Sequence, residues 1–344
     1  MVSSQRRYNT LNSATVDTST VYHYTPDMEK RKRFGDGLKE QLLASAKDRA
    51  YRFIMADGTV RGVVIHGTRM IKEMRANHEL GILETMVLGR AYLGVCLMAA
   101  QLKAANRIVM KIACAGPIQG LVVEGNAFGE VRGYLHQVPI AVDHPLDDFD
   151  LSPFFGGGVL SVTHHLTDAR EPFTGQVALR YGNIALDLVN YYLESEQIPT
   201  AFNLSIQFNR DGDVIGAGGL LLQALPDIDE QIVPGLESRV MKMPSLGTAF
   251  AKGKFPQDIV NRQFRAYHPN FLGSHRVEFM CHCNRPRLEK LLSLMPSEEL
   301  ENILEEESFP LEVRCHHCHT PYHFDKRHIQ SLYTQGTGGG LQGD

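Results

Sequence analysis

Six cysteines limit most strongly what this chain can fold into, because four of them lie close together near its C-terminal end. They form Cys281-His282-Cys283 and, after 31 intervening residues, Cys315-His316-His317-Cys318. The N-terminal segment lacks the apolar stretch of a secretion signal, so we expect a reducing, cytoplasmic compartment. In such a compartment, clustered cysteines indicate a metal site rather than a disulfide framework.

The spacing of these four cysteines suits a zinc ion. Structural zinc sites are tetrahedral and use sulfur or nitrogen ligands. A Cys-x-x-Cys turn reverses the chain so that both sulfurs face one point, and an extended Cys-x-Cys segment projects both side chains to the same face. The sequence therefore predicts one zinc ion per chain, bound by Cys281, Cys283, Cys315 and Cys318, with Tyr322 and Phe324 packed beside it.

Two alternatives remain open for this cluster. The four cysteines could be buried without a ligand, or a histidine could replace one sulfur. The histidines concerned are His282, His316, His317, His319 and His323. The other two cysteines, Cys96 and Cys114, lie in apolar surroundings and are interpreted as small packed residues.

The Cys-x-Cys spacing has a consequence of its own. A disulfide between residues i and i+2 closes a small, strained ring, and strained disulfides tend to be labile. The site could thus hold metal when reduced and expel it when oxidised, which would unfold a small domain that depends on the metal. A constitutive structural zinc clip is the alternative.

The remaining sequence predicts a strand-rich α+β domain. At about 150 residues per domain, 344 residues correspond to roughly two domains, and 43% hydrophobic residues are enough to form a core. We expect an N-terminal extension (1–47), an α+β core domain with packed helices (48–226), a helical, metastable linker (227–274), a small zinc-binding domain (275–333) and a flexible tail (334–344).

Local patterns support this division. Asp57-Gly58 and Asp211-Gly212 each lie between two strand-like runs and predict hairpins. The apolar stretch 86–102 is interrupted by Arg90 and predicts a buried helix rather than a membrane span. Gly216, Gly218 and Gly219 lie inside a strand pair, which favours close backbone packing over a phosphate-binding loop.

Several further segments have a recognisable sequence. They are Gly116-Pro117-Ile118, Val131-Arg132-Gly133-Tyr134, 158–163, 172–175, 191–199 and Ala217-Gly218-Gly219 with 223–226. Together with the four clustered cysteines, these segments resemble the 33 kDa chaperonins, a family of redox-regulated heat-shock chaperones. The resemblance covers about residues 50–330, and the N-terminal extension departs from the family pattern.

The resemblance implies a function. Members of this family are ATP-independent holdases that bind one zinc ion when reduced. Oxidation releases the zinc and forms disulfides, which here would join Cys281 with Cys283 and Cys315 with Cys318. The zinc domain and linker then unfold and expose a surface for unfolding client proteins, and the active form is a homodimer.

Other function classes fit the sequence less well. A constitutive zinc-ribbon module for a protein or nucleic-acid partner is conceivable because Arg285, Arg287, Lys290, Lys326 and Arg327 flank the cysteines. Neighbouring glutamates and a net charge of −4 argue against nucleic acid. Four sulfur ligands leave zinc no open position for catalysis, so we expect no enzyme. No membrane association is expected, and Arg6 and Arg7 give only a faint organelle-targeting signal.

Overall fold

A computed structural model describes residues 48–142, 150–306 and 308–338. All of them belong to one compact unit, Arg31–Asp344. The predicted N-terminal extension lies outside the described residues, as does the end of the predicted tail from residue 339 onward.

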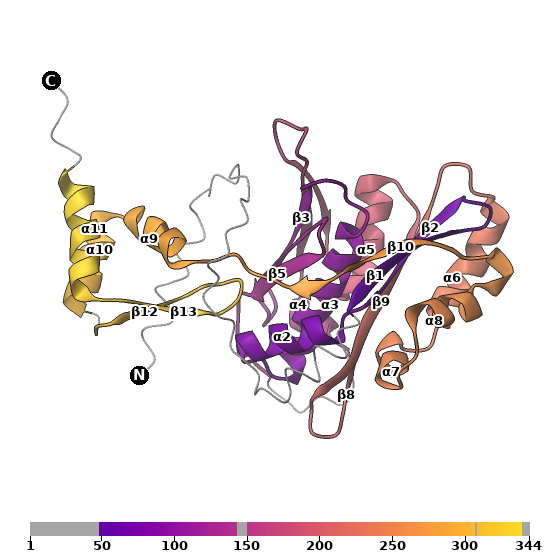
Figure 1. Cartoon of the computed structure of the whole chain (residues 1–344), viewed down its shortest axis with the longest axis horizontal. Coiled ribbons are helices and arrows are strands. Elements are labelled where there is room, and N and C mark those ends of the chain that lie inside the picture. The colour runs from indigo at the N-terminus through magenta and orange to yellow at the C-terminus, as the bar shows by residue number, and fades with distance from the viewer. Residues whose placement is uncertain (1–47, 143–149, 307, 339–344) are drawn as a thin grey trace. The chain divides into compact units, whose positions relative to one another are not determined.

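The first sheet has five antiparallel strands in the order β10-β1-β2-β9-β8 (Figure 1). Its strands are β1 (Arg49–Met55), β2 (Val60–His66), β8 (Thr200–Phe208), β9 (Val214–Ala224) and β10 (Asn270–Arg276). Both predicted hairpins are confirmed. At the first turn, Ala56, Asp57 and Gly58 have φ values of 51°, 54° and 88°. Aspartate and glycine adopt this left-handed conformation more readily than most residues.

The second sheet has six strands in the order β11-β5-β4-β3-β6-β7. Its strands are β3 (Arg107–Cys114), β4 (Gly120–Asn126), β5 (Glu130–Leu135), β6 (Gly158–His165), β7 (Phe173–Ala178) and β11 (Glu278–Phe279). Only β11 runs parallel to its neighbour, and the other pairs are antiparallel. The sequence predicts strands over 108–112, 121–124, 129–134, 159–163 and 173–181, and the structure has a strand in each place, the last one ending at Ala178.

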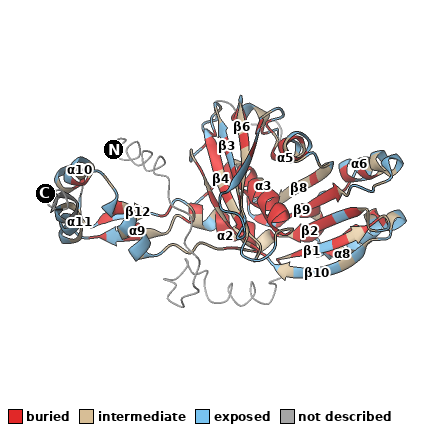
Figure 2. Ribbon diagram, turned by 90° about the horizontal axis from the view of Figure 1, so that it is seen from above, coloured by how far each residue is buried: buried red, intermediate tan, exposed pale blue. Residues whose placement is uncertain are grey.

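Helix α3 (Ile82–Ala99) lies between the two sheets and contacts β3, β4 and β5 on one side and β2, β8 and β9 on the other. It is buried around almost its whole circumference, as the red ribbon in Figure 2 shows. Among the described residues, α3 is the one helix long and apolar enough to cross a membrane, and 89% of its apolar window is buried inside the protein. A helix that is apolar on every face is expected in such a core.

The remaining helices of the core domain pack around this centre. They are α2 (Thr68–His78), α4 (Ser152–Phe155), α5 (Ile184–Tyr191) and the π-helical turn η2 (Tyr192–Glu196). The sequence predicts one continuous helix over 184–196, whereas the structure changes from α to π geometry at Tyr192. Helix α5 begins at Asn183, whose side chain accepts hydrogen bonds from the backbone N–H groups of Ala185 and Leu186.

The predicted linker forms short helices on the outer face of the first sheet. They are η3 (Glu230–Ile232), α6 (Val233–Met241), α7 (Leu246–Ala251), α8 (Pro256–Gln263) and η4 (Arg265–Tyr267). They bury a second apolar cluster, which contains Phe53, Met55, Val60, Val64, Leu220 and Leu222 from the sheet and Leu236, Val240, Met243, Leu246, Phe250, Val260 and Phe264 from the linker. A Cβ atom at Gly218 would lie 2.1 Å from the Phe250 ring, so close packing explains this glycine.

After the linker, residues 270–279 cross from one sheet to the other, and we call this segment the strap. Its first part is β10, an edge strand on β1, and its last part is β11, an edge strand on β5. Between them, the N–H of Val277 donates to the carbonyl of Asp48 (3.1 Å). The strap leads directly into the cysteine segment.

The C-terminal region has a hairpin and three helices. These elements are α9 (Arg285–Ser293), α10 (Ser297–Glu306), β12 (Leu311–Arg314), β13 (Pro321–Phe324) and α11 (Lys326–Gly338). The sequence predicts two helices between the cysteine pairs, over 286–294 and 296–306, and α9 and α10 confirm them. Helix α11 extends to Gly338, so the tail predicted from residue 334 begins as helix.

The position of α3 predicts a large cost for shortening one of its core side chains. Leu93 is fully buried, whereas Leu193 in η2 is 59% exposed. Leu93→Ala should lower the free energy of unfolding by about 2–5 kcal/mol. Leu193→Ala should change it by no more than about 0.5 kcal/mol. Urea unfolding of both variants tests this, and equal losses would contradict the position of α3 between the sheets.

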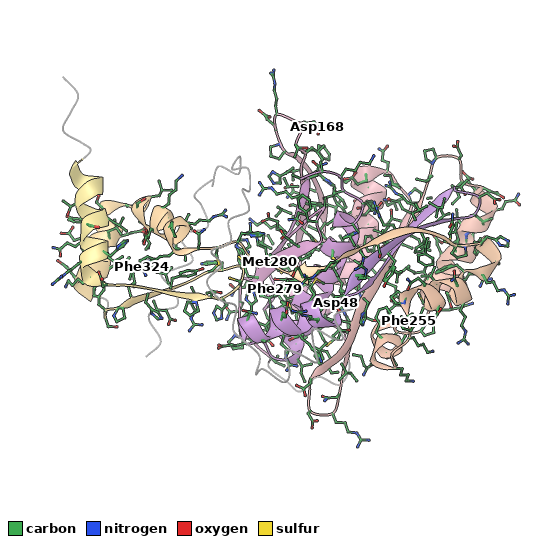
Figure 3. All side chains as sticks on the ribbon, viewed as in Figure 1. Asp48, Asp168, Phe255, Phe279, Met280 and Phe324 are labelled. Atoms are coloured by element: carbon green, nitrogen blue, oxygen red, sulfur yellow. The ribbon has the colours of Figure 1, made fainter. Side chains whose placement is uncertain are left out.

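Asp48, labelled in Figure 3, predicts a pH-dependent stability. Burial raises its pKa from the ordinary 3.8 to about 7, although the N–H of Met70 donates to its carboxylate (2.7 Å). Between these two pH values the folded chain binds this proton more tightly than the unfolded chain. The resulting stabilisation is complete below pH 3.8 and is lost as the pH rises through about 7.

Asp48→Asn should remove this dependence, which amounts to at most about 1.4 kcal/mol per pH unit. Urea unfolding at several pH values between 4 and 8 measures it. Asp168→Asn, at an exposed position also labelled in Figure 3, is the matched control. If the wild type and Asp48→Asn show parallel pH profiles, the carboxyl does not titrate as we expect.

Candidate metal centre

The four predicted cysteines lie together in the structure. Their sulfur atoms are all within 4.8 Å of one another. Cys281 and Cys283 follow the strap, whose end is marked by Phe279 and Met280 in Figure 3. Cys315 and Cys318 lie in the turn between β12 and β13. The first pair is half-buried and the second pair is buried.

The turn between β12 and β13 fixes the second pair. The N–H of His319 donates to the carbonyl of Cys315 (2.7 Å), and the N–H of Cys315 donates to the carbonyl of Thr320 (3.0 Å). His319 adopts a left-handed conformation with φ of 57°, which reverses the chain. The sequence analysis predicts the turn but not the hairpin that carries it, because each strand has only four residues.

The distances fit a tetrahedral metal site. A tetrahedron with metal–sulfur distances of about 2.3 Å has edges of about 3.8 Å. The sulfurs of Cys281 and Cys315 are 3.8 Å apart, and those of Cys283 and Cys318 are 3.3 Å apart. Among the described residues, the group that could hold a metal consists of these four cysteines alone. The donor set and its dimensions are therefore compatible with zinc.

The thiols also influence one another's protonation. Hydrogen bonds from Cys283 and then Cys315 and Cys318 hold the pKa of Cys281 well below its usual value. The same kind of hydrogen bonds, from Cys281 first, raise the pKa of Cys315 and Cys318. Without a cation, the cluster therefore shares its protons unevenly. A divalent cation would stabilise all four sulfurs as thiolates.

The two predicted aromatic residues accompany the cluster. The Tyr322 hydroxyl lies 3.2 Å from the sulfur of Cys283. Phe324, labelled in Figure 3, is fully buried, and the guanidinium of Arg285 lies 4.6 Å from its ring centroid. The prediction that both rings pack in this region is confirmed.

Strand β5 of the core domain reaches the cluster through Arg132. Its guanidinium donates to the sulfur of Cys281 over 3.8 Å and forms an ion pair with Glu124 at 2.8 Å. Glu124 in turn pairs with Arg107 at 3.4 Å. A second contact joins His282 to Glu130 at 2.9 Å. These contacts connect the half-buried cysteine pair to the second sheet.

Histidines form the rest of this contact surface. The imidazole of His78 lies 3.1 Å from the carbonyl of His317, and Tyr134 makes edge contacts with the rings of His316 and His317. Burial lowers the pKa of both His78 and His317 to about 4. Both rings are therefore neutral at pH 7, and they meet where α2 of the core domain faces the turn that carries Cys315 and Cys318.

Sequence analysis misses the partners of the cluster that come from the core domain. Arg132, Glu130 and Tyr134 lie on β5, far from the cysteines in sequence. The segment Val131-Arg132-Gly133-Tyr134 contributes to the family resemblance, but nothing in its sequence pattern indicates a contact with Cys281. Cys96 is buried in α3 as predicted, and Cys114 is half-buried at the end of β3.

The basic residues near the cysteines are used in part for local contacts. Arg285 pairs with Glu289 at 3.0 Å and donates to the carbonyl of His323 at 2.8 Å. The ammonium group of Lys326 lies 5.7 Å from the Phe309 ring centroid. These two cations stabilise the C-terminal region itself, which accounts for their position without a nucleic-acid partner.

Comparison with known proteins gives a consistent result. A family model described as Hsp33 protein matches residues 48–325. A 33 kDa chaperonin of Desulforamulus reducens is 35% identical over 287 residues, which cover 83% of this chain and 97% of the relative. A 33 kDa chaperonin of Lachnoclostridium phytofermentans is 31% identical and covers 84% of this chain and 99% of its own length.

A solved structure agrees with these relatives. The crystal structure of the 33 kDa chaperonin (heat shock protein 33 homolog) from Thermotoga maritima superposes with a TM-score of 0.76 at 30% identity. The match covers 85% of this chain and 99% of that protein. The predicted α+β fold and the predicted family are therefore both confirmed, and this chain belongs to the Hsp33 family of chaperones.

Proposed function

We propose that this chaperone is a redox-regulated, ATP-independent holdase. In the reduced protein, Cys281, Cys283, Cys315 and Cys318 bind one zinc ion. Oxidation joins Cys281 to Cys283 and Cys315 to Cys318, the zinc leaves, and the zinc domain and linker unfold. The observation that carries the proposal is the group of four sulfurs within 4.8 Å of one another in a member of this family.

The chemistry of the switch lies in the cysteines. Bound zinc keeps the sulfurs as thiolates, the form that reacts with oxidants. Peroxide transfers an oxygen atom to the thiolate of Cys281 or Cys283, giving a sulfenic acid and hydroxide. The neighbouring thiolate attacks that sulfur and displaces a second hydroxide as the disulfide forms. A second peroxide oxidises Cys315 and Cys318 in the same way.

The half-burial of Cys281 and Cys283 supports an attack on that pair first, since the other pair is buried. Loss of two thiolates also removes the Cys281 contact of Arg132, which keeps its ion pair with Glu124. The C-terminal region is then left with a small apolar core and no metal to hold its two cysteine segments together. Domains of this size depend strongly on such a link.

The linker helices offer a surface for clients. Helices α6, α7 and α8 have nine, six and eight residues, which is too short for independent stability in water. They are held by the second apolar cluster on the first sheet. When the linker unfolds, the sheet's apolar side chains become available to unfolding proteins. The proposal includes two further points. The oxidised protein forms a homodimer, as the family does, and the protein is located in the cytoplasm.

Zinc content and chaperone activity, measured on one sample, test this function. Before oxidation we expect one zinc per chain and little suppression of client aggregation. After peroxide with mild heat, the zinc should be lost and aggregation of a chemically unfolded client suppressed. Cys283→Ser should weaken zinc binding because it removes one ligand. Cys114→Ser, outside the cluster, is the control and should behave like the wild type.

Retention of zinc with no gain in activity would contradict the switch and favour a constitutive zinc module. Salt-dependent binding of nucleic acid by the reduced protein would point to the nucleic-acid version of that alternative. Mapping of the oxidised peptides decides the pairing. Disulfides between Cys281 and Cys315 or between Cys283 and Cys318 would overturn the predicted pairs.

Arg132 predicts a change in the rate of zinc loss. Its guanidinium donates to Cys281, and such a contact lowers the electron density that a thiolate offers to an oxidant. Arg132→Gln should therefore release zinc about three- to tenfold faster at a fixed peroxide concentration. A chromogenic chelator reports the release.

Arg314→Gln is the matched control for Arg132→Gln. It removes the same charge next to Cys315, but Arg314 bonds to Glu312 at 2.6 Å on an exposed face. Its zinc should leave at the wild-type rate. If both variants accelerate zinc loss equally, the effect is one of net charge and not of the contact between Arg132 and Cys281.

A further inference from the structure

We propose that the outer edge of β1, which the strap covers in this structure, binds an extended segment of an unfolding polypeptide. The segment would join the first sheet as an additional antiparallel strand in the place of β10. This inference rests on the proposed function, because activation must first free the strap. It specifies how a client is held and what chemistry the bound segment needs.

The strap itself shows what this edge accepts. β10 pairs with β1 from Arg49 opposite Arg276 to Ile54 opposite Asn270, with an irregularity between Arg52 and Phe53. Every residue of β10 is exposed or half-buried, whereas β1 buries Ala50, Phe53 and Met55. β10 is therefore held on β1 largely by main-chain pairing, whereas Val277 and Phe279 at the end of the strap are buried. Main-chain pairing tolerates many sequences, as a chaperone for diverse clients requires.

One side chain of β10 makes a specific apolar contact. The ring of Phe271 lies 5.4 Å from that of Phe53 and 6.5 Å from that of Tyr51, measured between centroids. Phe53 also belongs to the apolar cluster beneath the linker helices. A bound segment with an aromatic residue at this position would therefore continue into the apolar surface that the linker leaves behind.

The charges of the strap match this edge poorly. Arg276 lies directly opposite Arg49. Like charges in directly opposite positions destabilise a strand pair. The strap relieves this by pairing Arg276 with its own Glu278 at 2.8 Å, while Arg49 bonds to Ser274. A segment with an acidic residue opposite Arg49 would fit better than the strap does.

These observations define the ligand as an extended segment with one aromatic and one acidic residue five positions apart. The aromatic residue takes the place of Phe271 and the acidic residue the place of Arg276. The strap is a weaker ligand of the same kind, tethered to the protein. It therefore covers the edge in the reduced state and can be displaced once its tether to the cysteine segment loosens.

Labelled peptides test this inference on the full-length, peroxide-activated protein. One peptide has the sequence of residues 270–279, a second carries Arg276→Glu, and a third carries Phe271→Ala. Fluorescence anisotropy gives the affinities. The Arg276→Glu peptide should bind about two- to fivefold more tightly than the first peptide, and the Phe271→Ala peptide more weakly. The reduced protein should bind all three poorly.

A charge exchange identifies the edge. On the protein variant Arg49→Glu, the preference should reverse in favour of the peptide that keeps arginine. Lys111→Glu makes the same charge change at an exposed position on β3 of the other sheet and should leave the preference unchanged. Hydrogen exchange should show that peptide binding protects residues 49–55. An unchanged preference on Arg49→Glu overturns the inference.

The same samples separate this inference from the proposed function. If the activated protein suppresses client aggregation but residues 49–55 gain no protection from peptide, the function holds and the edge is not the client site. If protection of 49–55 increases with protein concentration alone, a second copy occupies the edge and the inference is wrong. If aggregation is not suppressed at all, the proposed function fails and the inference fails with it.

Discussion

The convergence of four sulfurs is the constraint on which the C-terminal region depends. Its three helices and four-residue strands supply only the C-terminal part of one continuous apolar cluster, and the two cysteine pairs lie at the start of the region and in its hairpin turn. A region of this size buries too little surface to be stable without an additional link. Whatever breaks the contact among the sulfurs therefore removes a large share of the region's folding free energy at once.

The core domain does not depend on such a link. Helix α3 is enclosed by two sheets and needs neither metal nor disulfide to remain buried. The same chain thus contains a core domain that is stable by itself and a C-terminal region whose stability is conditional on the link among its sulfurs. Local unfolding of the conditional part is possible because the two are joined at sheet edges, through the buried side chains of Val277 and Phe279 and polar contacts such as those of Arg132, and not through an inner strand.

The contrast also explains what could be predicted from the sequence. The Asp57-Gly58 hairpin, the apolar helix α3 and the four cysteines each follow from residues close together in the chain. The contact between Arg132 and Cys281 joins residues 149 positions apart, and that between Arg49 and Ser274 joins residues 225 positions apart. No local pattern contains such pairings. The hairpin β12–β13 could not be predicted because its strands are short. The helical start of the tail could not be predicted because its glycines and polar residues resemble a coil.

The position of the strap makes a reversible switch physically reasonable. β1 keeps β2 as a partner when β10 leaves, and β5 keeps β4 when β11 leaves. Neither sheet loses an inner strand, although departure of the strap also removes the buried Phe279, whose ring stacks on Tyr92 of α3 at a centroid distance of 6.3 Å. An attachment through inner strands would couple release of the metal to collapse of the whole fold. Attachment at two edges instead leaves the inner strands of both sheets paired when the strap departs.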